Sequence, residues 1–314
     1  MSVRFNVLAC CIACVAVLGA LVLAPAAGAA RVGSTYLALG DSLAYGYHQA
    51  QFEEELKNTG TVNPANFNAG YVDDFSSFLR IANPHLQTIN DGCPGETTET
   101  FINGSGTTGF CAGGPTGTLF PDSFLHHPYT AGGSQLADAL SILAANNNVS
   151  PITLDIGSND VLQFLEHTCG FPSTDTCTEA QVGAEFEKIA TNVGSILGQL
   201  HAAAPKAQIV LIGAYNPFPT VVPGGDKTQA ALNSLLEGVA AKVPNASFAN
   251  TLPVFNPSLI TGGPETQDIP FICAYTGMCP GGTFNPASPE ADIHPTRLGY
   301  LVFAGVVSFD FWTH

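Results

Sequence analysis

The chain has 314 residues, of which 25 are Asp or Glu and only 9 are Lys or Arg, so its formal net charge is −16 at pH 7. Nine cations in such an acidic chain cannot neutralise a run of phosphates, which excludes a basic nucleic-acid-binding protein and disfavours anionic membrane surfaces. Because 46% of the residues are hydrophobic, the chain can bury a large core and is not intrinsically disordered.

The first thirty residues differ from the rest of the chain. Arg4 is the only charged residue among them, and residues 7–23 are continuously apolar until Pro25 and the small residues that follow it. This pattern is typical of a secretory signal peptide, so we expect residues 1–29 to be removed and residues 30–314 to form a single domain. A retained membrane anchor is the alternative, because the apolar run is nearly long enough to span a bilayer.

Short apolar runs then alternate with longer segments of helical periodicity. We predict strands over residues 36–39, 86–90, 152–156, 209–212 and 246–249, of which the last has the weakest pattern. Helices are expected where apolar residues recur every three or four positions, over residues 135–143, 182–200, 230–243 and 298–309. Continuous apolar strands belong in a sheet covered on both faces, so the alternation predicts a three-layer α/β/α sandwich around a parallel sheet of about five strands.

Six cysteines remain after the predicted cleavage, and an even number in an exported chain argues for disulfides rather than metal thiolates. We expect each cysteine to pair with its neighbour along the chain, as Cys93–Cys111, Cys169–Cys177 and Cys273–Cys279. Each bond would close a loop and so restrain a segment that has little secondary structure. Six buried free thiols are the alternative, which would require a reducing compartment.

The tetrapeptide Gly40-Asp41-Ser42-Leu43 stands where the first predicted strand ends. Gly40 allows a sharp turn of the backbone, and Ser42 would begin a helix, where free N–H groups and the helix dipole favour an attacking or developing oxyanion. The same tetrapeptide would also serve as an ordinary helix cap. Asp41, like Asp160 in a later motif, is expected to make structural hydrogen bonds.

A nucleophilic serine needs a base, and His294 is the best placed of the eight histidines. It lies just before the last predicted helix, and Pro295 is a residue that favours the start of a helix. Asp292 stands two residues before His294. An acidic neighbour can orient an imidazole as a general base, whereas a lone surface histidine is usually only solvated.

Two further segments offer donors to a developing oxyanion. Gly95 follows the second predicted strand and can present its backbone N–H without a side chain in the way. Asn159 follows the third strand and can point its amide toward the same place, although both segments are also common turn sequences. Since open α/β sheets bind ligands at the carboxyl ends of their strands, we expect Ser42, Gly95 and Asn159 to converge there.

These blocks, in this order, resemble the GDSL or SGNH hydrolases, and the stretches Cys93-Pro94-Gly95-Glu96-Thr97-Thr98 and Asp155-Ile156-Gly157-Ser158-Asn159-Asp160 are similar to the secreted, disulfide-bearing bacterial branch. The resemblance implies a flavodoxin-like sandwich and a secreted serine esterase or lipase. It implies that Ser42 is the nucleophile and His294 the general base, and that the N–H groups of Ser42 and Gly95 and the Asn159 amide form the oxyanion hole. We expect no metal and no organic cofactor, because the histidines show no HExxH-like pairing and the cysteines are better used as crosslinks.

The third member of a catalytic triad departs from the family pattern. The family acid usually stands three residues before the histidine, where this chain has Ala291. Asp292 is one position closer and Glu290 one position farther, and Asp292 could reach His294 because side chains two apart share a face of an extended segment. We favour a Ser–His dyad in which the Ala291 carbonyl holds the imidazole, and keep Asp292 as the candidate third member.

The substrate is less constrained by the sequence. The apolar loop 215–222 and the Gly-rich residues 100–133 could wall an acyl pocket, which favours lipid or aryl esters as substrates. Acetylated carbohydrate, acyl transfer at the same site and an inactive cell-surface binding protein are the alternatives. We expect a secreted or envelope-associated monomer that acts on a small-molecule or lipid ester, with no nucleic acid and no stable membrane insertion.

Overall fold

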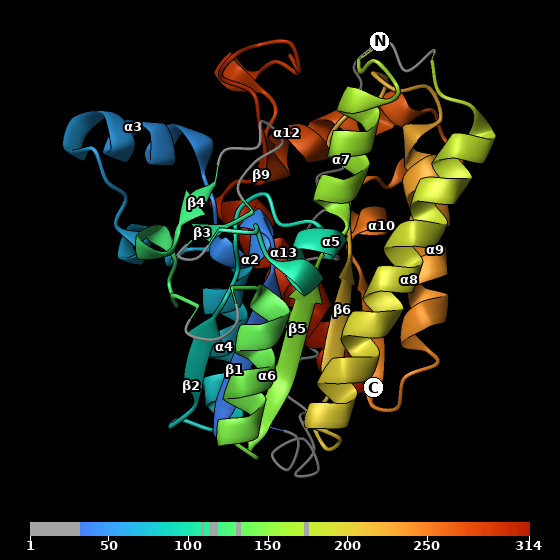
Figure 1. Cartoon of the computed structure of the whole chain (residues 1–314). Helices are drawn as coiled ribbons and strands as arrows, with labels where there is room; N and C mark the ends of the chain where they lie inside the picture. The colour runs from blue at the N-terminus through green and yellow to red at the C-terminus, as the bar shows by residue number, and fades with distance from the viewer. Residues whose placement is uncertain (1–31, 108–109, 113–118, 130–132, 173–175) are drawn as a thin grey trace.

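The computed structural model describes residues 32–107, 110–112, 119–129, 133–172 and 176–314, so the predicted signal peptide lies outside the described residues. Its centre is a parallel sheet of five strands in the order β2-β1-β5-β6-β7 (Figure 1). Their bounds are β1 Thr35–Gly40, β2 Gln87–Asn90, β5 Val149–Asp155, β6 Ile209–Gly213 and β7 Ala246–Asn250. All five predicted strands are present, and the direction of winding reverses between β1 and β5, which is where such sheets form a ligand crevice.

Alternate residues of β1 face two different helical layers. Leu37 and Leu39 pack in a cluster with residues of α5 Thr98–Asn103, α6 Gln135–Ala145, α8 Glu179–Ala203 and α9 Gly225–Ala240. Tyr36 and Ala38 pack on the opposite side with residues of α4 Tyr71–Ala82 and α13 Arg297–Thr313. The predicted three-layer α/β/α sandwich is therefore confirmed.

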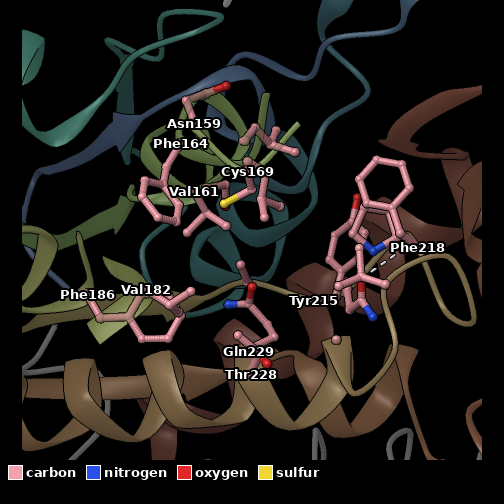
Figure 2. A pocket seen from close by; sticks show the side chains of 18 of the residues that line it. Asn159, Val161, Phe164, Cys169, Val182, Phe186, Tyr215, Phe218, Thr228 and Gln229 are labelled. Atoms are coloured by element: carbon pink, nitrogen blue, oxygen red, sulfur yellow. Dashed lines mark hydrogen bonds between the residues drawn. The ribbon is translucent and has the colours of Figure 1, made fainter. Parts of the chain in front are cut away.

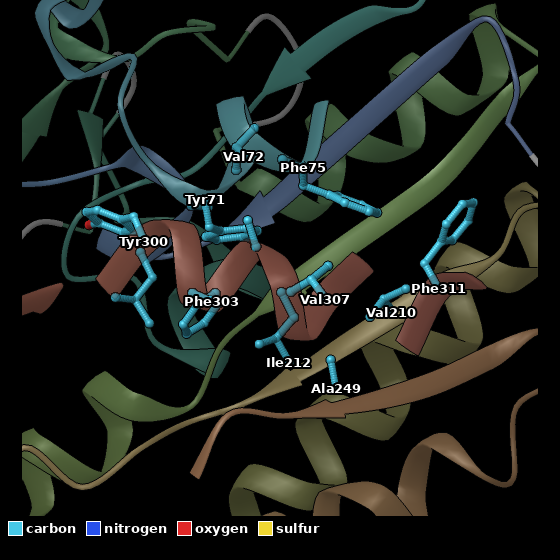
Figure 3. Packing of buried hydrophobic residues seen from close by; sticks show 14 of the residues in the cluster. Tyr71, Val72, Phe75, Val210, Ile212, Ala249, Tyr300, Phe303, Val307 and Phe311 are labelled. Carbon is cyan, nitrogen blue, oxygen red and sulfur yellow. The ribbon is translucent and has the colours of Figure 1, made fainter. Parts of the chain in front are cut away.

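The layer formed by α4 and α13 is held by large aromatic side chains (Figure 3). The Tyr71 and Phe303 rings lie 4.9 Å apart and the Phe75 and Phe311 rings 5.7 Å apart, and all four side chains are fully buried. Burial of this much apolar surface is the main force that holds the last helix on the sheet. This contact places the segment just before α13, which contains His294, against the body of the fold.

Shorter elements fill the connections at the carboxyl edge of the sheet. The additional α-helices are α2 Ser42–Tyr45, α3 Gln49–Thr59, α7 Ser158–His167, α10 Leu252–Phe255, α11 Ser258–Thr261 and α12 Ile269–Tyr275. Two antiparallel ribbons pair β3 Phe110–Cys111 with β4 Phe120–Pro121, and β8 Thr276–Gly277 with β9 Asp292–Pro295. Single 3-10 turns span Pro64–Phe67, Asp122–Phe124, Glu265–Gln267 and Pro280–Gly282. Within the described ranges, no helix combines the length and apolar character needed to cross a membrane.

Three disulfides join the cysteine pairs predicted from the sequence. Cys93–Cys111 ties the loop after β2 to β3, Cys169–Cys177 connects the end of α7 to the start of α8, and Cys273–Cys279 links α12 to the turn after β8. Each bond thus restrains a connection at the sheet edge where the sequence predicts the site.

Candidate active site

The turn between β1 and α2 presents Ser42. Gly40 has a φ of +139°, and a Cβ added there would lie 2.2 Å from the carbonyl oxygen of Asp155, so this position requires glycine. Asp41 caps α2, because its Oδ1 accepts the N–H of Leu43 at 2.9 Å. Ser42 is therefore the first residue of α2 and is half-buried, and the N–H groups of the two residues after it are bonded to Asp41 and Asp155.

The side chain of His294 joins Ser42 to Asp292. Nε2 of His294 lies 2.8 Å from Ser42 Oγ, and Nδ1 lies 2.5 Å from Asp292 Oδ1. The imidazole partner is thus the Asp292 carboxylate, which corrects our preference for the carbonyl of Ala291. The reason is that β9 is extended, so the side chains of residues 292 and 294 share a face, and Asp292 Oδ1 also accepts the His294 backbone N–H at 3.0 Å.

The Asp292 carboxylate is kept ionised. Its Oδ2 accepts the backbone N–H of Gln49 at 2.9 Å. Burial by itself raises the pKa of Asp292. The charge of His294 and the hydrogen bonds from His294 and from the Gln49 N–H lower it by more, so the pKa lies below its ordinary value. A charged carboxylate at this place can stabilise an imidazolium on His294.

Asn159 joins three chain segments at the ends of the strands. It is the second residue of α7 and is 8% exposed, and its Nδ2 donates to the Glu96 carbonyl at 3.0 Å and to Asp41 Oδ2 at 3.3 Å. Gly95 has a φ of +84°, is buried and stands next to the Glu96 carbonyl that Asn159 contacts. The structure thus brings Asn159 into a cavity with Ser42 and His294, whereas Gly95 is not among the residues that line this cavity.

A buried polar network that we did not predict supports this turn. Gln135 accepts the Gly40 N–H on Oε1 at 2.6 Å and donates Nε2 to the Gly40 carbonyl at 2.9 Å and to Glu96 Oε2 at 3.3 Å. Burial raises the pKa of Glu96 to about 8, which favours the neutral form of this carboxyl group at neutral pH. In the sequence Gln135 is an ordinary first residue of a helix, and no motif indicates its contact with Gly40.

Asp160 has the structural role that the sequence predicts. Its carboxylate accepts the Thr98 N–H at 2.9 Å and the Thr98 hydroxyl at 2.6 Å. The Thr98 hydroxyl in turn accepts a hydrogen bond from Asn192 of α8 at 2.9 Å. Asp160 therefore joins α7 to α5, and through α5 it holds the loop that contains Gly95.

An apolar cavity of about 570 Å³ opens beside Ser42 and His294. Figure 2 shows side chains of α7, α8, α9 and the loop after β6 around it, among them Val161, Phe164, Val182, Phe186 and Phe218. The predicted wall 215–222 contributes Tyr215, Asn216, Pro217, Phe218 and Val222. No described residue of 100–133 lines the cavity, so that prediction is wrong for the described part of the segment. Cys111, Phe120 and Leu125 instead pack around Tyr45 in a separate cluster.

The sequence analysis missed the walls formed by α7 and α8. Val161 and Phe164 are spaced three residues apart, and Val182 and Phe186 four, which is also the spacing of an ordinary core-facing stripe. Their half-buried side chains line the cavity, and the tertiary arrangement that brings the two helices together around it has no signature in either segment.

Asp91, His127 and Asp138 are a group with the chemistry of metal ligands, since one ligand atom of each lies within 4.8 Å of the others. Nδ1 of His127 lies 2.8 Å from Asp91 Oδ1 and 3.3 Å from Asp138 Oδ2. The two adjoining carboxylates raise the pKa of His127 to about 10, which favours an imidazolium between them. The group therefore acts as an ion-pair clamp that attaches residues 119–129 to β2 and α6.

Comparison with known proteins decides the family. The model of the GDSL-like lipase/acylhydrolase family matches residues 38–302, which include all four sequence blocks and the entire five-stranded sheet except its first residues. The chain belongs to this family. As a GDSL-like acylhydrolase it is a carboxylic ester hydrolase.

Solved structures agree with the family fold. The lipase Lip_vut3 from a goat rumen metagenome is 18% identical, with a TM-score of 0.51, and the match covers 87% of this chain and 94% of that one. A catalytic mutant of Axe2, an acetylxylan esterase from Geobacillus stearothermophilus, is 14% identical with a TM-score of 0.51, covering 90% and 96%. At these identities the similarity shows the fold alone. Comparison with curated protein sequences found no match.

Proposed function

We propose that this GDSL-like acylhydrolase is a secreted serine esterase that hydrolyses esters of medium- and long-chain fatty acids through an acyl-enzyme on Ser42. The observation that carries the proposal is the position of the Ser42–His294–Asp292 chain at the wall of an apolar cavity of about 570 Å³. A site for acetyl groups needs little apolar volume, whereas an acyl chain gains free energy with each methylene that it buries, about 0.8 kcal/mol.

In the proposed reaction, Ser42 Oγ attacks the ester carbonyl while His294 Nε2 takes its proton. The negative charge that develops on the carbonyl oxygen is stabilised by the Ser42 N–H and the Asn159 amide, because both residues line the cavity. His294 then protonates the leaving alcohol, and it next activates the water that hydrolyses the acyl-enzyme. Asp292 holds the imidazole in the required tautomer throughout.

Secretion is proposed on two grounds. The six cysteines of residues 30–314 form three disulfides, a state that persists in oxidising compartments. The apolar N-terminal stretch has the order of features typical of a signal peptide.

Asn159→Ala is expected to reduce kcat about a hundredfold or more, because removal of one oxyanion-hole donor typically costs about 2.7–4 kcal/mol of activation free energy. The measurement is steady-state hydrolysis of a p-nitrophenyl ester, with the melting temperature recorded for each variant. Asn192→Ala is the matched control, since its amide also makes a part-buried hydrogen bond, at 2.9 Å to Thr98, but it does not line the cavity. Equal losses in the two variants would contradict the proposed role of Asn159.

Gly183→Leu is expected to shift the acyl preference toward short chains. Gly183 lines the cavity on α8, and a Cβ added there would meet no atom within 4 Å, so a larger side chain can enter the space without a clash. We expect the ratio of kcat/KM for p-nitrophenyl decanoate over acetate to fall about tenfold, since a methylene or two in an apolar pocket is worth about that factor.

Gly198→Leu is the control for this experiment, because Gly198 is on the same helix with equally open space but lies outside the cavity lining. Wild-type enzyme should prefer decanoate over acetate. A preference for acetate, unaltered by Gly183→Leu, would contradict the fatty-acyl assignment and favour an acetylated substrate.

A further inference from the structure

Helix α3, Gln49–Thr59, has no buried residue and projects from the body of the fold (Figure 1). A helix with no buried face gains little stability from packing, and its own propensity is marginal at 11 residues. It follows the Ser42 helix after only Gly46–His48, so its N-terminus is held close to the candidate active site. The contacts of that N-terminus indicate what it does.

The start of α3 contacts the acid, and the residues around it contact the base. The Gln49 N–H donates to Asp292 Oδ2 at 2.9 Å, and the Tyr47 ring lies 4.7 Å from the His294 imidazole. Phe52 of α3 packs on Tyr47 at 5.2 Å, so the helix also supports that ring. Asp292 Oδ1 already receives two hydrogen bonds from His294, which leaves Oδ2 for the helix.

The need for such support follows from the position of the acid. Asp292 and His294 are two residues apart in the four-residue strand β9, which forms a two-stranded ribbon outside the main sheet. A contact between two groups of one short peripheral strand does not fix their position relative to Ser42. A contact from the segment that also contains Ser42 fixes this position, because it joins Asp292 at one end of the Ser–His–Asp chain to the segment of Ser42 at the other end.

We propose that the Gln49 backbone N–H at the N-terminus of α3 is a positioning group that holds Asp292 in register with His294 and Ser42. The inference rests on the proposed function, since it concerns the same proton transfer. The N–H at this position has no acceptor within its own helix, and the positive end of the helix dipole favours a carboxylate there.

Gln49→Pro tests the proposal, because proline removes the N–H and its ring takes the space of the hydrogen. Proline is tolerated at the first position of a helix, and His48, with φ −136° and ψ 116°, has the extended backbone required before proline. Gln49→Ala is the reference variant: it loses the same side chain, including its hydrogen bond to Glu53, and keeps the N–H.

We expect kcat of Gln49→Pro to be about tenfold below that of Gln49→Ala, with KM within about twofold, since a hydrogen bond to a charged group is worth roughly this factor. In an Asp292→Ala background the difference between the two variants should disappear, because the group that the N–H positions is absent. Equal kcat values in the wild-type background, or the same difference in both backgrounds, would overturn the proposal.

A second measurement does not depend on the folding of the proline variant. Hydrogen exchange of the Gln49 amide should be slowed in the wild-type protein and become about as fast as in an exposed amide in Asp292→Ala. If the Gln49 amide exchanged at the same rate in the wild-type protein and in Asp292→Ala, the hydrogen bond between Gln49 and Asp292 would be disproved. Failure of the proposed function has a different signature, because wild-type protein would then neither hydrolyse esters nor react with a fluorophosphonate.

Discussion

Ser42→Ala is expected to lower p-nitrophenyl ester hydrolysis by about 10⁴-fold or more and to abolish labelling by a fluorophosphonate, which reacts only with an activated serine hydroxyl. The substitution removes the attacking Oγ, which lies 2.8 Å from His294 Nε2, and leaves the Asp292–His294 contact in place. Alanine also suits the first turn of α2, so the melting temperature should change little. Kinetics and intact-protein mass spectrometry measure both effects.

Ser158 provides the matched comparison for this experiment. It lines the same cavity but has no hydrogen bond to His294 among the contacts of the described residues. The label should therefore map to the peptide that contains Ser42, and Ser158→Ala should still be labelled. Labelling that persists in Ser42→Ala and is lost in Ser158→Ala would contradict the assignment of Ser42 as the nucleophile.

Asp292→Asn is expected to reduce kcat by about 10²- to 10⁴-fold, with a smaller effect on KM. Asparagine keeps the shape of aspartate but cannot stabilise the imidazolium charge, and its amide favours the wrong tautomer of the imidazole. The structure motivates this prediction, because His294 Nδ1 lies 2.5 Å from Asp292 Oδ1. In a Ser–His dyad held by the Ala291 carbonyl, the same substitution would change kcat by no more than about threefold.

Glu290→Gln is the control for the Asp292 variant. It removes a carboxylate from the same segment, and the Glu290 side chain is exposed and makes no hydrogen bond to His294 in the described structure. We expect its kcat to stay within about twofold of wild type, as for most exposed charges. Similar losses in both variants would indicate a general electrostatic effect rather than a specific acid.

The central strands β1 and β6 were predictable because each contains a continuous apolar run, and burial on both faces of a sheet requires such a run. The outer strands β2 and β7 are more polar and only partly buried. The Gly-Asp-Ser-Leu block was predictable for a local reason, since a strand that turns directly into a helix needs a glycine and a cap. The disulfide pairs followed from proximity along the chain. The helix α4 was not predicted, although Tyr71, Phe75 and Leu79 are spaced as in an amphipathic helix, because only a helix that begins at Ser42 was expected between the first two strands.

The third member of the triad could not be chosen from spacing. An extended segment allows both an Asp292 carboxylate and an Ala291 carbonyl to approach His294, and only the placement of β9 beside α3 selects the carboxylate. The cavity wall formed by α7 and α8 could not be predicted for a similar reason, since the sequence of each helix is equally compatible with an ordinary face that packs on the core.

The amino-acid sequence by itself therefore determined the strands, the nucleophile turn, the candidate base and the crosslinks, because each depends on residues that are close together in the chain. The tertiary structure decided the apolar cavity, the support of Gly40 by Gln135 and the contact of Gln49 that holds Asp292 beside His294, because these are contacts between segments far apart in the sequence. Neither surface of such a contact specifies the other until packing of the core brings the two together.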